Sequence, residues 1–310
     1  MDISKNKEKI GVLGPEGTFS HQAAKKLIGM DSGQACLAGR QARMTNNSEI
    51  IFYKTIHDVF EAVEKGECDK GVVPIENSLG GSVGFTLDAL LEYDLTIELE
   101  EIVPIVHCLL GVKGTKKSGV KYLYAHTQAY SQCEKYIREN LPNAEVLETT
   151  SNGESARLVR ERRKGPSLAA QHGHTKDGPL QYAAIAPEIT AEIYGLEILQ
   201  KSIQDSKHNA TKFVVISKAE TKPSGYDRTS VTVYPQIDRP GILYEILGYF
   251  KDANLNLSKV ESRPSKGKLG DYIFYIDFHG HINEKPVQKV IRELEKIAFV
   301  KILGSYGRRY

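Results

Sequence analysis

The chain has 310 residues, of which 40% are hydrophobic and 26% charged, the composition of an ordinary globular protein with room for two domains. A formal net charge of +2 argues against a general electrostatic grip on nucleic acid, and no apolar run approaches the roughly twenty residues that span a membrane. The four cysteines form no C-x-x-C pair and the N-terminus does not read as a signal peptide, which predicts free thiols in a reducing compartment. We therefore expect a cytoplasmic protein with no nucleic-acid or membrane partner.

The first predicted strand, Ile10–Leu13, runs through a glycine-containing loop into a predicted helix over His21–Leu27. The loop is neither a Walker A sequence nor a G-x-G-x-x-G, which argues against nucleotide binding. It is expected to place the hydroxyls of Thr18 and Ser20 at the edge of a sheet, where either can also cap the helix. The stretch 29–47 has little periodicity and is expected to be an irregular excursion.

The stretch GVVPIENSLGGS is the principal candidate site in the sequence. It ends a short buried strand at Pro74, which is expected to stop ladder pairing, and a helical pattern begins at Val83. A strand that passes through polar side chains and two glycines into a helix places side chains and free N–H groups at a sheet edge, where α/β proteins bind ligands. The alternative is a turn that uses these residues for their backbone tolerance.

Strands continue to alternate with helices as far as about residue 216, which predicts an α/β domain with mainly parallel sheets. Leu95–Val112 alternates and then runs apolar, which suits long strands crossing between two lobes, and 165–181 is again irregular. The polar segment Lys218–Arg228 is the expected domain boundary. Beyond it the pattern is βαββαβ, that of a small ferredoxin-like domain that could pair with a second copy.

Four segments in this order resemble the prephenate dehydratase family: GPEGTFS, VVPIENSLGGSV, HTQAYSQC and NATKF. The C-terminal domain resembles that family's ACT regulatory domain, with GIL at Gly241–Leu243 and ESRP at Glu261–Pro264. The resemblance implies a catalytic domain over 1–220 that is similar to periplasmic binding proteins, with two α/β lobes and a cleft between them, followed by an ACT domain over 228–310. Because no helical region precedes Ile10, it implies a monofunctional chain without the chorismate mutase domain of some relatives.

The implied reaction is the decarboxylating dehydration of prephenate to phenylpyruvate in phenylalanine biosynthesis. It needs a hydrogen-bond donor for the departing hydroxide and a grip on two carboxylates, but no metal or cofactor. The resemblance makes Thr211 the donor to the leaving hydroxyl, and a neutral Glu76 with a raised pKa is the alternative donor. The catalytic residues implied are Thr211, Glu76, Asn77 and Gln132, and the substrate-binding residues are Thr18, Ser78, Thr150 and Lys212.

For several of these residues a purely structural role is an alternative. Thr18, Ser78 and Thr150 can equally cap helices or form turns. Lys212 stands where the family motif has arginine, so a bidentate clamp on a carboxylate becomes a point charge. Ala125 stands where several relatives have serine.

The resemblance also implies that phenylalanine binds between paired ACT domains of a homodimer or homotetramer and regulates the enzyme. The effector residues would be Gly241, Ile242, Leu243, Glu261, Ser262, Arg263 and Pro264. Two alternatives stay open at this point. One is an arogenate dehydratase acting on the aminated substrate, and the other is a cytosolic small-ligand sensor without catalysis.

Overall fold

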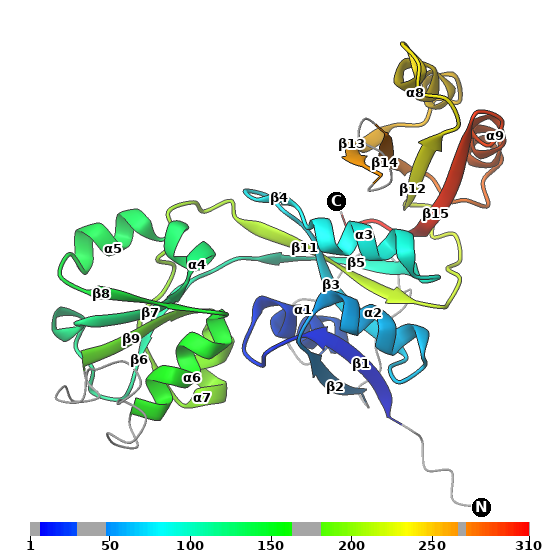
Figure 1. Ribbon diagram of the computed structural model, residues 1–310. Helices are drawn as coiled ribbons and strands as arrows, with labels where there is room; N and C mark the ends of the chain where they lie inside the picture. The colour runs from blue at the N-terminus through cyan, green and yellow to red at the C-terminus, as the bar shows by residue number, and fades with distance from the viewer. Residues whose placement is uncertain (1–6, 30–47, 163–180, 266–270, 310) are drawn as a thin grey trace, which may run out of the picture.

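The structure is a computed structural model that describes residues 7–29, 48–162, 181–265 and 271–309. Figure 1 shows two α/β lobes side by side and a C-terminal domain next to the first of them. Within the described ranges, no helix is both long and apolar enough to cross a membrane. The two stretches expected to be irregular, 29–47 and 165–181, lie almost wholly outside the described residues.

The first lobe is built around strands in the order β5-β11-β3-β1-β2, with β4 paired to β3. Strand β1 pairs in parallel with β2 and β3, whereas β11 pairs antiparallel with β3 and β5. Apolar side chains on both faces of this sheet pack against its helices. The elements are β1 (Glu8–Leu13), α1 (Phe19–Ile28), β2 (Ser48–Tyr53), α2 (Ile56–Glu64), β3 (Lys70–Asn77), β4 (Gly81–Ser82), α3 (Gly84–Glu92), β5 (Thr96–Pro104) and β11 (Ala210–Ser217).

The sequence predicts that strand β3 ends before Pro74, but β3 passes through Pro74 and continues to Asn77. The register between β3 and β11 shifts between Lys212 and Phe213, opposite Pro74. A bulge is one of the few places where a strand accepts a proline. The polar residues after Pro74 therefore lie on the strand itself.

The second lobe has a five-stranded sheet in the order β10-β6-β9-β7-β8. Strand β7 pairs in parallel with β8 and β9, and the other two pairs are antiparallel. The expectation of mainly parallel sheets is therefore only partly right in both lobes. The elements are β6 (Cys108–Gly111), η1 (Lys117–Gly119), β7 (Tyr122–His126), α4 (Thr127–Ser131), α5 (Glu134–Asn140), β8 (Glu145–Thr149), α6 (Asn152–Arg162), β9 (Tyr182–Ala186), α7 (Glu188–Tyr194) and β10 (Glu197–Gln200).

The chain crosses between the lobes twice. It leaves the first lobe after β5, enters β6 in the second, and returns from β10 to β11. The two crossing segments are joined by a hydrogen bond of 2.8 Å from the Ile105 N–H to the Asn209 carbonyl. This confirms the predicted bilobed arrangement, and the two crossing segments run side by side from one lobe to the other (Figure 1).

The C-terminal domain has the predicted βαββαβ order, with strands arranged β13-β14-β12-β15. Apolar side chains of its sheet pack against its two helices to form a separate core. The fold prediction, a bilobed α/β domain followed by a ferredoxin-like domain, is thus confirmed. The elements are β12 (Asp227–Pro235), α8 (Ile242–Asp252), β13 (Leu257–Pro264), β14 (Tyr272–His279), α9 (Lys285–Leu294) and β15 (Ala298–Gly307).

The C-terminal sheet joins the sheet of the first lobe directly. Strand β15 meets β5 at Gly304 and Ile97, where a Cβ on Gly304 would collide with the Ile97 carbonyl oxygen. Beside this junction Arg228 and Glu100, both almost completely buried, form an ion pair of 2.6 Å. Removing one member of such a pair would leave a buried charge without its counter-ion, so the pair ties the two domains together.

A second contact between the domains lies along β13. Ser82 of β4 donates a hydrogen bond of 2.5 Å to Glu261 and accepts one of 2.6 Å from Lys259. Arg263 lies 3.3 Å from Asp88 of α3. Three side chains on alternate positions of β13 thus hold the segment that directly follows β3.

Candidate active site

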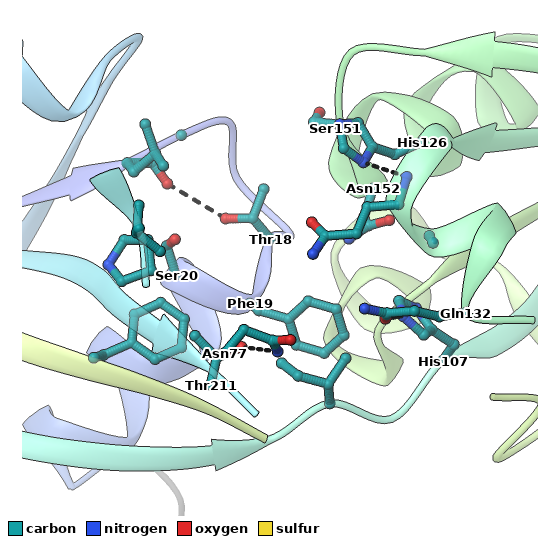
Figure 2. Close-up of a pocket in the computed structure, with 18 of the residues that line it drawn as sticks. Thr18, Phe19, Ser20, Asn77, His107, His126, Gln132, Ser151, Asn152 and Thr211 are labelled. Carbon is teal, nitrogen blue, oxygen red and sulfur yellow. Dashed lines mark hydrogen bonds between the residues drawn. The ribbon is translucent and has the colours of Figure 1, made fainter. Parts of the chain in front are cut away.

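A cavity of about 350 Å³ lies between the two lobes, above the crossing segments (Figure 2). This is at the lower end of the range for small-molecule sites. Among the described residues that line it, none is a lysine, an arginine or a carboxylate. The lining residues are Leu13, Gly14, Thr18, Phe19, Ser20, Ile56, Pro74, Asn77, Val83, Ile105, His107, His126, Gln128, Ala129, Gln132, Thr150, Ser151, Asn152, Thr211 and Phe213.

The N-termini of two helices, one from each lobe, contribute to the cavity wall. Thr18 is the N-cap of α1 and accepts a hydrogen bond of 3.4 Å from the His21 N–H. Across the cavity, Ser151 accepts one of 3.1 Å from the Glu154 N–H in the first turn of α6. Helix N-termini carry positive partial charge and unpaired N–H groups, so each favours an anion. The cavity therefore offers two anion-binding walls, to which the described part of the chain contributes no cationic side chain.

Glycine allows the two lobes to approach closely at this point. A Cβ on Gly153, in α6, would collide with the carbonyl oxygen of Glu16 in the loop before α1. A Cβ on Gly17, whose φ is +85°, would lie 2.6 Å from a methyl carbon of Thr190 in α7. The loop before α1 therefore packs against the second lobe and closes one side of the cavity.

Asn77 and Thr211 face each other across the pairing of β3 and β11. The Asn77 amide nitrogen donates to the Thr211 hydroxyl oxygen at 2.9 Å and to the Asn209 side-chain oxygen, also at 2.9 Å. Since the Thr211 oxygen accepts from Asn77, its own proton is available to a molecule in the cavity. Figure 2 shows the two residues together at the cavity wall.

Gln132 approaches the same cavity from the second lobe, where it follows the last turn of α4 (Figure 2). Its side-chain oxygen lies 2.9 Å from His107 Nε2 and 2.8 Å from the Asn209 amide nitrogen. Burial lowers the pKa of His107, and the hydrogen bond to Gln132 only partly opposes this, so the ring is neutral near pH 7. Asn209 lies between the two lobes and contacts both Asn77 and Gln132.

Glu76 and Lys212 are not among the lining residues. Adjacent residues of a strand point to opposite faces, so these two lie behind Asn77 and Thr211 and form an ion pair of 2.9 Å there. Burial alone would raise the Glu76 pKa, but the hydrogen bond and charge of Lys212, with Lys259 and Arg228 nearby, lower it overall. A carboxyl group with a lowered pKa is ionised at neutral pH, which argues against the neutral Glu76 donor considered from the sequence.

Ser78 is also outside the cavity lining. Its hydroxyl donates to the His208 carbonyl at 3.0 Å and accepts from the Ala210 N–H at 2.9 Å, which fixes the returning crossing segment. Thr150 does line the cavity, but its hydroxyl donates to the Glu154 carboxylate at 2.5 Å, while Ser151 and not Thr150 caps α6. The cavity thus brings together Thr18, Asn77, Gln132, Thr150 and Thr211 of the predicted site and leaves out Glu76, Ser78 and Lys212.

Asn209, His107 and Phe19 are among the residues at this site that were not predicted from the sequence. Asn209 directly precedes β11 and is two positions before Thr211, a spacing that could have indicated it if the strand were extended by one residue. His107 is a single histidine in an apolar run and carried no signal of its own. Phe19 packs edge-on against the His107 ring, with centroids 5.3 Å apart.

The residues predicted to bind the effector occupy two places in the C-terminal domain. Gly241 has a φ of +84° at the N-cap of α8, and a Cβ there would contact nothing within 4 Å. Glycine is therefore needed here for its backbone angle, not for close approach within one chain. Glu261 and Arg263 point to the first lobe. A site between two chains needs a second copy, so the effector role of these residues stays a proposal.

The chain matches two family models, described as prephenate dehydratase over residues 10–221 and as ACT domain over residues 235–298. It is 38% identical to the bifunctional chorismate mutase/prephenate dehydratase of Aquifex aeolicus, over 98% of this chain and 75% of that protein. It is 36% identical to the prephenate dehydratase of Methanocaldococcus jannaschii, over 97% of this chain and 98% of that protein. Among solved structures, prephenate dehydratase from Arthrobacter aurescens in complex with L-Phe superimposes with a TM-score of 0.79 at 31% identity, covering 97% of this chain and 90% of that one.

Proposed function

Because the chain belongs to the prephenate dehydratase family, we propose that it is a carbon–oxygen lyase that converts prephenate to phenylpyruvate, carbon dioxide and water in phenylalanine biosynthesis. The observation that carries the proposal is the cavity between the lobes, where neutral donors from both lobes converge. A dianionic substrate with a ring hydroxyl suits two helix N-termini and a free hydroxyl proton.

In the proposed reaction the bond between the ring carbon and its carboxylate breaks, and the electron pair enters the ring. The C–O bond to the ring hydroxyl breaks as the ring becomes aromatic, and the departing hydroxide takes a proton from solvent to leave as water. We assign Thr211 as the donor to that departing oxygen, because Asn77 holds its oxygen as an acceptor. Threonine is a weak acid, so its contribution is to stabilise developing charge by a preorganised hydrogen bond.

The N-termini of α1 and α6 would hold the two carboxylates, with Gln132 as a further donor, and Thr18 would donate after its hydroxyl leaves the Leu13 carbonyl, to which it donates at 3.4 Å. Asn77 is a positioning residue in this scheme, because its amide groups are already bonded to the protein. Thr150 would contact substrate through its backbone or after its hydroxyl leaves Glu154. Lys212 would act from behind the strand by pairing with Glu76.

We also propose that residues 1–220 form the catalytic domain and 228–310 a regulatory domain that pairs with a second copy and binds phenylalanine. The relative from Arthrobacter aurescens was solved with L-Phe, which supports this choice of effector. Homodimer and homotetramer are distinguished by light scattering with and without phenylalanine. A cytoplasmic location is part of the same proposal, since the described cysteines, Cys68, Cys108 and Cys133, are free and buried.

The test is turnover of prephenate by the purified chain, with phenylpyruvate measured against a no-enzyme control. The expected result is rapid formation of phenylpyruvate. Arogenate is tested in parallel, because two chloroplast relatives from Arabidopsis thaliana carry both activities in their names and are 33% and 31% identical. Turnover of neither substrate would overturn the proposal, and faster turnover of arogenate would replace its substrate.

A further inference from the structure

The hydrogen bonds around Gln132 form a connected series. Backbone N–H groups at one end fix which atom donates and which accepts in every bond of the series. We propose that Asn209 and His107 are positioning residues that force the Gln132 amide to present its NH₂ group, not its oxygen, to the substrate. The catalytic part of this inference rests on the proposed function, whereas the orientation of the amide rests on the hydrogen bonds alone.

The series of hydrogen bonds begins at Asn77. Its side-chain oxygen accepts hydrogen bonds from the backbone N–H of Leu79 at 3.0 Å and of Gly80 at 2.8 Å. An amide side chain can be turned over without changing its shape, so its oxygen and nitrogen are told apart only by their partners. A backbone N–H can only donate. The atom of Asn77 that faces these two groups is therefore its oxygen, and its nitrogen points the other way.

The next link is Asn209. Because the Asn77 nitrogen donates to it at 2.9 Å, the atom of Asn209 on that side is the oxygen. The nitrogen of Asn209 then lies on the far side, 2.8 Å from Gln132. A nitrogen that carries two hydrogens requires an acceptor, so the atom of Gln132 at this point is the oxygen. The backbone N–H groups in the first lobe thus determine, through Asn77 and Asn209, which atom of Gln132 in the second lobe accepts the hydrogen bond.

His107 completes the arrangement. Its Nε2 lies 2.9 Å from the same Gln132 oxygen, and that oxygen can only accept. The neutral ring must therefore carry its proton on Nε2. Within the described residues, His107 Nδ1 is buried and has no hydrogen-bond partner, which agrees with a bare nitrogen at that position. Two donors now hold the Gln132 oxygen, and its NH₂ group is left for the cavity.

The orientation matters because the two ends of the amide act oppositely on an anion. An NH₂ group donates to a carboxylate or a departing hydroxide, whereas an oxygen repels it. Loss of one preorganised donor lowers turnover by roughly 10²–10³-fold in well-studied sites. We expect reversal of the amide to cost at least the lower figure.

Asn209→Asp tests this, because it keeps the side-chain shape and replaces the donor to Gln132 with an acceptor. The Gln132 amide then has to turn over, donating to the new carboxylate and to His107. The expected result is a kcat at least ~100-fold lower, with a smaller change in KM. Asn143→Asp, the same change in an exposed turn between α5 and β8, is the control and should stay within twofold.

Nitrogen NMR of the full chain with labelled histidine gives a readout that turnover does not. His107, assigned by the signal lost in His107→Gln, should be the Nε2–H tautomer in the unsubstituted protein and the Nδ1–H tautomer in Asn209→Asp. An Nδ1–H tautomer in the unsubstituted protein would overturn the inference, as would an Asn209→Asp enzyme within threefold of full kcat. If the unsubstituted chain fails to turn over prephenate, the proposed function fails, and the tautomer still decides the orientation.

Discussion

Thr211→Val is the sharpest test of the proposed chemistry. Valine has nearly the same shape as threonine and removes only the hydroxyl, so the packing of β11 is kept. The Asn77 nitrogen loses one acceptor but keeps two, the Asn209 side-chain oxygen at 2.9 Å and the Ala210 carbonyl at 3.2 Å. It is therefore not left unpaired, and we expect a loss of folding stability of only about 1 kcal/mol.

Turnover should respond very differently. If the Thr211 hydroxyl stabilises the departing oxygen, kcat should fall by roughly 10²–10³-fold, equal to about 2.7–4 kcal/mol in the barrier. KM should change little, because the carboxylates are held elsewhere. Thr211→Ser restores the hydroxyl and should recover activity to within about tenfold of the unsubstituted enzyme.

The assay is steady-state formation of phenylpyruvate, with thermal unfolding followed on the same samples. A Thr211→Val enzyme that retains kcat within a few-fold while remaining folded would refute the assignment of Thr211. A fall in kcat matched by a large loss of stability would point to a structural role instead. The two variants together separate these outcomes.

Three further outcomes follow from the structure. Gly153→Ala should lower kcat/KM by ~10–100-fold in steady-state assays, because the new methyl group collides with the Glu16 carbonyl and separates the lobes; unchanged kinetics would contradict the closure inferred there. Arg228→Ala should cost about 3–5 kcal/mol in urea unfolding, since it leaves buried Glu100 without its counter-ion, and a loss below 1 kcal/mol would argue against that pair. Burial and the charge of Lys25 lower the pKa of His21 to about 4, so the unfolded chain binds an extra proton between about pH 6.5 and 4. Stability should fall by ~3 kcal/mol as the pH drops through that window, and His21→Gln should remove this part of the slope in pH-dependent unfolding.

Most of the fold could be predicted from the sequence. The periodic apolar positions of α8 and α9 between short strands predicted the C-terminal βαββαβ order, and the alternating then apolar run over Leu95–Val112 predicted a crossing between lobes. These patterns depend on which face each residue buries, and burial repeats with the period of the element. The predicted end of β3 was wrong because the bulge that accommodates Pro74 lies on β11, well over a hundred residues away in the sequence.

At the site, the sequence could identify strands but not which face each residue occupied. Asn77 and Thr211 point into the cavity, while their neighbours Glu76 and Lys212 point away, and a shift of one position would exchange the pairs. The charge state of Glu76 depends on Lys212, Lys259 and Arg228, which the fold brings together. For the same reason the bond from His107 to Gln132 could not be foreseen.

The hydrogen bonds of Ser82 connect β13 of the C-terminal domain to the turn that follows Asn77 in the active site. Lys259 and Glu261 hold Ser82, and the backbone N–H groups of Leu79 and Gly80 lie in the tight turn that joins β3 to β4. A shift of β13 by a fraction of an ångström has to be absorbed in that turn, which also orients the Asn77 amide. An effector that moved β13 would thus change the position of the Asn77 amide without rearranging the hydrophobic core of the C-terminal domain or of the first lobe.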